Sequence, residues 1–160
     1  MSLIHLPKGT TGFWHRSDSP PELRVSLEQF TQAVTRLGAG SRARATDIVS
    51  RLMMGSGNFY SALLEHTTDP AKTRVALLNP YVPYAACALP AREAGQAEHE
   101  LVDPPPDWPS HLCGAEVLSK EVLTSALSKA ALSQLAKAEL EQVHYWQPQN
   151  AGELLFHFWD

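Results

Sequence analysis

The chain has 160 residues, of which 44% are hydrophobic and 19% charged, and its formal net charge is −4. This length suits one domain with a single core, and the apolar content excludes wholesale disorder. We therefore expect residues 1–160 to form one domain.

The first residues, MSLIHLPKGTTGFWHR, lack a basic stretch followed by a long apolar run, and no later stretch of about 18 residues is apolar. This predicts neither a signal peptide nor a membrane-spanning segment. Two cysteines, Cys87 and Cys113, are too few for a disulfide scaffold. We therefore expect a cytoplasmic protein that does not bind a membrane.

Residues 1–21 are rich in turn-forming residues and predict an irregular lead-in, which leaves room for a short strand at 12–16. Residues 22–78 are expected to be helical. The first helix, 22–37, has apolar residues at three- and four-residue steps: Leu23, Leu27, Phe30, Val34 and Leu37. Similar patterns predict helices at 43–54 and at 58–66, the latter capped by Asn58, whereas 71–78 fits a helix or a strand equally well.

Residues 79–114 contain seven prolines and predict a long loop, because proline cannot donate a backbone hydrogen bond. Residues 115–160 are expected to be helical again. An alanine-rich run that ends at Val143 predicts either one helix or two helices with a break at 128–133. Asn150 is expected to cap a short helix at 151–159. The predicted fold is therefore mainly α, a bundle of about five helices with at most a small β element near the N-terminus.

Charge is unevenly distributed along the chain. Residues 1–92 hold ten Lys and Arg against six Asp and Glu, whereas residues 93–160 hold three against eleven. No Lys or Arg lies between Glu93 and Ser119. This acidic stretch predicts a basic partner and disfavours binding to nucleic acid or to an anionic membrane.

The sequence contains no motif for catalysis or for a cofactor. The cluster of His99, His111 and Cys113 lacks the paired spacing of a zinc site, and the glycines at 55–57 do not complete a phosphate-binding loop. We expect no catalytic residue, no metal ligand, no cofactor and no enzymatic activity.

The C-terminal segment carries five aromatic residues in 16 positions. We expect the side chains of Trp146, Phe156, Phe158 and Trp159 to pack onto the core, since an exposed aromatic tail promotes aggregation.

This ending, YWxP followed by GExxFxxWD, resembles the close of small bacterial immunity proteins encoded beside polymorphic or secreted toxins. The resemblance covers only residues 142–160. It implies a cytoplasmic protein that neutralises a cognate toxin by binding it stoichiometrically and occluding it. A basic nuclease-like domain is one possible toxin. On this hypothesis the expected contacts lie in the acidic stretch and are Glu98, Glu100, Asp103, Asp107 and Trp108.

Two other readings fit the same residues. An adaptor or secretion chaperone would also be small and acidic, and would hold a partly folded client. An enzyme of unfamiliar type would need a pocket in which His99 or His111 meets an acid or a thiol. The sequence does not predict an oligomeric state.

Overall fold

The computed structural model describes residues 4–52, 57–91, 99–157 and 159. Its centre is a seven-stranded sheet, in the order β1-β2-β3-β4-β7-β6, with β5 also paired to β4. The strands are β1 (Ala43–Ser50), β2 (Tyr60–His66), β3 (Arg74–Asn79), β4 (Tyr84–Ala88), β5 (Leu101–Val102), β6 (His111–Leu112) and β7 (Ala115–Val117). The helices are α1 (Leu27–Gly40), α2 (Lys120–Leu123), α3 (Lys129–Leu132), α4 (Lys137–Trp146) and α5 (Ala151–Leu155), with a 3-10 turn η1 (Pro70–Lys72).

The expectation of a mainly α bundle is wrong, because the middle of the chain forms a mixed sheet. The segments predicted as helices at 43–54 and 58–66 contain β1 and β2, and the ambiguous segment 71–78 contains β3. Residues 53–56 lie outside the described part. Strand β4 lies in the segment predicted to be a loop. No strand forms at 12–16.

The strands lack the alternating pattern of a half-exposed sheet because both faces are covered. In β2 and β3, Tyr60 and Ala76 face the core beneath α1, whereas Leu77 belongs to the core on the opposite face. Strands buried on both faces have nearly continuous apolar sequences, and periodicity alone does not separate them from buried helix. This is why RVALLN in β3 carries no clear strand signal.

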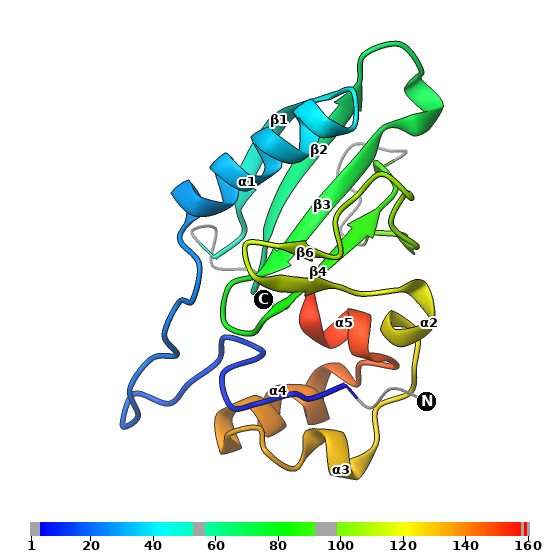
Figure 1. Ribbon diagram of the computed structural model, residues 1–160. Helices are drawn as coiled ribbons and strands as arrows, with labels where there is room; N and C mark the ends of the chain where they lie inside the picture. Colours follow the sequence, from blue (N-terminus) through cyan, green and yellow to red (C-terminus); the bar gives the residue numbers. More distant parts are fainter. Residues whose placement is uncertain (1–3, 53–56, 92–98, 158, 160) are drawn as a thin grey trace.

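Helix α1 confirms the first predicted helix, although it begins later and extends to Gly40. Ser26 caps it, and a reciprocal bond with the Gln29 side chain completes a capping box. Figure 1 shows α1 lying along β1 and β2. Phe30 and Val34 are fully buried against the sheet.

The C-terminal helices and the N-terminal segment cover the opposite face of the sheet. Figure 1 shows α3, α4 and α5 gathered beside the N-terminal segment, away from α1. The alanine-rich run is broken into α2, α3 and α4, and Ser128 caps α3 within the predicted break. Asn150 caps α5, as predicted, although this helix ends at Leu155.

Two buried asparagines tie these layers together. The side chains of Asn58 and Asn79 both donate to the carbonyl of Thr10, and they also donate to the carbonyls of Leu154 and Leu155 in α5. The prediction that Asn58 caps a helix is therefore wrong. Its side chain instead joins the N-terminal and C-terminal segments.

The aromatic C-terminus mostly packs inward. Phe156 and Trp159 are buried, and the Trp146 ring stacks on Trp159 at 6.3 Å but keeps 37% of its surface exposed. Phe158 lies outside the described residues. Within the described ranges, no helix is long and apolar enough to cross a bilayer.

Candidate functional site

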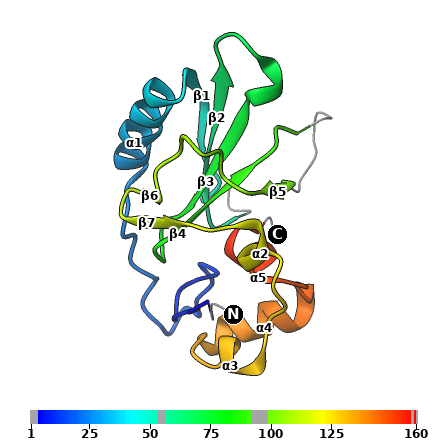
Figure 2. The same cartoon turned by 45° about the vertical axis from the view of Figure 1, so that its right-hand side comes forward.

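The proline-rich segment between β5 and β6 lies across the sheet on the same side as α1. Figure 2 shows it crossing in front of β2 and β3. Trp108 is half-buried and packs against the core beneath α1, and the Cys113 thiol donates to the carbonyl of Gln29 in that helix. Residues 103–110, which we call the wall segment, lie opposite the C-terminal end of α1, where Gly40 and residues 105–108 line one cavity.

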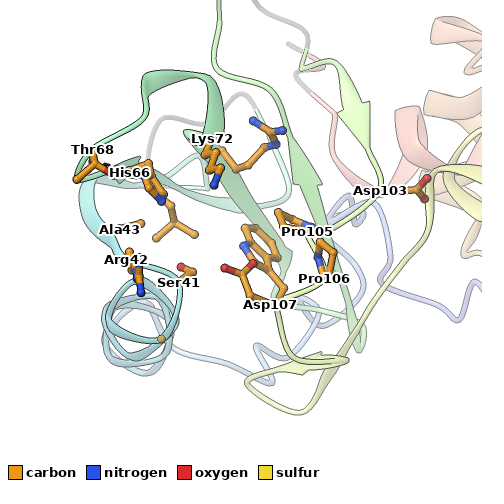
Figure 3. Close-up of a pocket in the computed structure, with 14 residues that line it drawn as sticks. Ser41, Arg42, Ala43, His66, Thr68, Lys72, Asp103, Pro105, Pro106 and Asp107 are labelled. Atoms are coloured by element: carbon orange, nitrogen blue, oxygen red, sulfur yellow. Dashed lines mark hydrogen bonds between the residues drawn. The ribbon is translucent and has the colours of Figure 1, made fainter.

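A cavity of about 610 Å³ opens between this wall and the end of α1 (Figure 3). The residues that line the cavity come from α1, β1, β2, η1, β3, the turn between α1 and β1, and the wall segment. Its charged and aromatic lining residues are Arg42, His66, Lys72, Arg74, Asp103, Asp107 and Trp108. We call this cavity the cationic pocket, because Arg42, Lys72 and Arg74 line it.

Arg74 is the best-anchored cation of this pocket. Its Nη1 donates to the carbonyls of Ala71 and Thr73 at 2.8 and 2.9 Å. Its Nε is buried and has no hydrogen-bond partner among the described residues. Lys72 and Arg42 complete the set with exposed side chains.

The hydrogen bonds of His66 fix its tautomer. Its Nδ1 accepts from the backbone N–H groups of Thr68 and Asp69 at 3.3 and 3.0 Å. A neutral imidazole that accepts at Nδ1 carries its proton on Nε2. Since this ring lines the cavity, its Nε2–H adds a further donor to the pocket.

The two carboxylates of the pocket behave differently. Asp103 accepts from the backbone N–H of Lys120 at 2.8 Å, which ties it to the start of α2. In Figure 3 it lies well apart from the other labelled residues. Asp107 is exposed and lies on the wall segment. The cavity therefore has three cations against one nearby, unattached carboxylate.

A second hollow of about 580 Å³ lies on the side of the C-terminal helices. Glu100, Trp146 and Glu153 line it, together with Lys120. Tyr145, next to Trp146, is 75% exposed. An aromatic surface beside carboxylates suits the side chain of an arginine or a lysine.

The structure thus divides the predicted contact residues between two places. Asp103, Asp107 and Trp108 line the cationic pocket, Glu100 lines the second hollow, and Glu98 lies outside the described residues. The basic residues that face the acidic segment, Arg42, Lys72 and Arg74, were not predicted to be part of a site. Their only signal was the basic excess of the first 92 residues, which does not say where those side chains meet.

Burial makes both cysteine thiols harder to ionise. Burial raises the pKa of the Cys87 thiol to about 12, and burial also raises the pKa of Cys113. A thiol is a poor nucleophile until it ionises. No group of three His, Cys, Asp or Glu side chains in the described part of the chain is placed to hold a metal ion.

Comparison with known proteins gave no relative: no protein family, no curated protein and no solved structure matched this chain.

Proposed function

We propose that this chain is a cytoplasmic immunity protein that binds a cognate bacterial toxin and blocks its active site. The observation that supports the proposal is an acidic edge made by the segment around β5, β6 and β7. Its carboxylates are all exposed and have no ion-pair partner among the described residues: Glu100, Asp103, Asp107 and Glu116.

Unpaired carboxylates on one edge create a field that extends into solvent. Toxins that cleave nucleic acid need a basic cleft for their substrate, and such a cleft is attracted to an acidic surface. Steering of this kind raises the association rate, whereas a buried aromatic anchor slows dissociation. Trp146, which lines the second hollow together with Glu100 and lies against the ring of Tyr145, offers that anchor.

The first experiment is recovery of the partner. The tagged chain is purified from its native cells, and the protein that co-purifies in equal ratio is identified by mass spectrometry. A folded basic protein that is toxic alone and harmless when co-expressed with this chain supports the proposal. Recovery of varied unfolded proteins would favour a secretion chaperone.

The charge mechanism is tested with a triple variant, Glu100→Gln, Asp107→Asn and Glu116→Gln. Association with the recovered toxin should slow by about tenfold at low salt and depend less on salt concentration, because steering is electrostatic. Asp103 is left unchanged because it caps α2. Stopped-flow fluorescence at several salt concentrations measures both effects.

A matched control carries the same change in charge elsewhere. Asp18, Glu22 and Asp47 are exposed and lie outside the acidic edge. The variant Asp18→Asn, Glu22→Gln and Asp47→Asn should retain most of the association rate. Equal slowing in both variants, or none in either, would contradict an acidic-edge interface.

A further inference from the structure

We propose that the cationic pocket binds a small phosphate monoester whose ring system lies against Trp108. The proposal does not rest on toxin binding. It concerns the cavity between α1 and the wall segment, which shares Asp103 and Asp107 with the acidic edge. It is carried by the donors and charges that meet in this cavity.

The hydrogen-bonding groups of the pocket are mostly donors. The Nε2–H of His66, the Lys72 ammonium group and the guanidinium of Arg42 supply them. Arg74 adds positive charge beside them, since its Nη1 donates to backbone carbonyls and its Nε is buried. Arginine is also well suited to phosphate, which it binds through two parallel N–H groups.

The charge balance favours phosphate over carboxylate. Arg42, Lys72 and Arg74 contribute three positive charges, and Asp107 contributes one nearby negative charge, whereas Asp103 lies well apart from the other labelled residues (Figure 3). The excess of two matches a phosphate monoester, which carries about −1.5 to −2 at neutral pH. A carboxylate carries a single negative charge and would neutralise only half of the excess positive charge.

The remaining surface of the cavity suits a ring system. Trp108, Pro105, Pro106 and Leu64 form its apolar walls. Indole stacks well on flat rings, and the cavity volume of about 610 Å³ lies in the range of small-molecule sites. Asp107 can accept a hydrogen bond from an amino or hydroxyl group of the ligand.

The test uses three probes: adenosine 5′-monophosphate, adenosine and inorganic phosphate. Binding to the full chain is followed by calorimetry and by NMR shifts of the amides at 41–43, 66–74 and 105–108. The monophosphate should bind more tightly than either of its halves and shift these amides. No shift with the monophosphate at millimolar concentration, or equal binding of adenosine, would overturn the proposal.

Two exposed side chains are then changed, so that folding is preserved. Lys72→Gln and Arg42→Asn should each weaken binding by about tenfold, the usual effect of losing a hydrogen bond to a charged group. Asparagine is chosen because Arg42 has a positive φ of 55°, which asparagine tolerates.

The control is Arg44→Gln, an exposed residue of β1 that does not line the cavity. It removes the same charge and should leave affinity nearly unchanged. If Arg44→Gln weakens binding as much as Lys72→Gln does, the probe is attracted by net charge alone and the proposed site is wrong.

Discussion

At the scale of single residues, buried polar groups hold the N-terminal segment in place. His157 is 3% exposed, and its Nε2 lies 2.7 Å from the carbonyl oxygen of Thr11. Because a carbonyl only accepts, Nε2 is the donor, and Nδ1 accepts from the N–H of Trp159 at 3.3 Å. The ring is therefore bonded as a neutral imidazole, and a proton on Nδ1 would break the second bond.

Burial lowers the pKa of His157 from 6.5 to about 4. The unfolded chain therefore binds this proton more readily than the folded one, so the stability is complete above about pH 6.5 and is lost as the pH falls towards 4. The loss should reach about 3 kcal/mol, given 1.36 kcal/mol for each pH unit between the two values. Urea unfolding from pH 7.5 to 4 should show it.

The variant His157→Gln should have a flatter profile over this range, since the titrating group is gone. His144→Gln, at an exposed position of α4, is the control and should retain the wild-type profile. An unchanged slope in His157→Gln would assign the pH dependence to other groups.

Glu139 is the second buried group and has no exposed surface. Its carboxylate accepts from the N–H groups of Gly9, Thr11 and Ala136 at 2.8–3.0 Å, and from the Thr11 hydroxyl at 2.8 Å. Glu139→Gln places an NH₂ group against some of these donors, and each donor left unsatisfied costs about 1–3 kcal/mol.

We therefore expect Glu139→Gln to lower the free energy of unfolding by about 3 kcal/mol, measured by urea unfolding at pH 7. Glu141→Gln provides the comparison. Glu141 is exposed and pairs with His15 at 3.6 Å, so its change should cost under about 1 kcal/mol. Similar losses in both variants would contradict a special role for Glu139.

At the scale of elements, the acidic segment serves partly to build the fold. Asp103 accepts from Lys120 N, the first N–H of α2, while Ser119 accepts from the N–H of Val122. Both contacts satisfy backbone groups that a short helix leaves unpaired at its start.

Asp103→Ala should accordingly lower the free energy of unfolding by about 1 kcal/mol, as the loss of a cap does. Asp107→Ala, four residues along the same segment, removes an exposed side chain that bonds to no backbone group in the described part of the chain, and should stay within about 0.5 kcal/mol of the wild type. Paired urea titrations measure the difference. Equal stabilities would mean that the contact of Asp103 with α2 contributes little.

At the scale of the whole molecule, the uneven charge along the chain becomes a charge separation across the sheet. Exposed Arg44 lies on β1 and exposed Arg42 directly before it, at one end of the strand order, whereas Glu116 lies on β7 near the other. The cationic pocket lies where the wall segment returns towards the basic end, so one chain presents an acidic edge and a cation-lined cavity.

The sequence by itself determined features that depend on neighbours along the chain. The spacing of Phe30 and Val34 predicted α1, because a helix face is set by three- and four-residue steps. Asn150 predicted the start of α5 by capping, and the aromatic content of the C-terminus predicted the burial of Phe156 and Trp159. The excess of carboxylates after residue 92 was also evident from composition.

Only the tertiary structure decided the sheet and the pocket. The strands β2 and β3 are apolar on both faces, so their period of two is hidden, and they pair with residues 5 to 18 positions away along the chain. In the same way, Arg42, Arg74 and Asp107 are far apart in sequence, and no local pattern records that they share one cavity. Strand order and the path of the wall segment decide which side chains meet. Both depend on the burial of residues that are distant in sequence, so no local pattern predicts them.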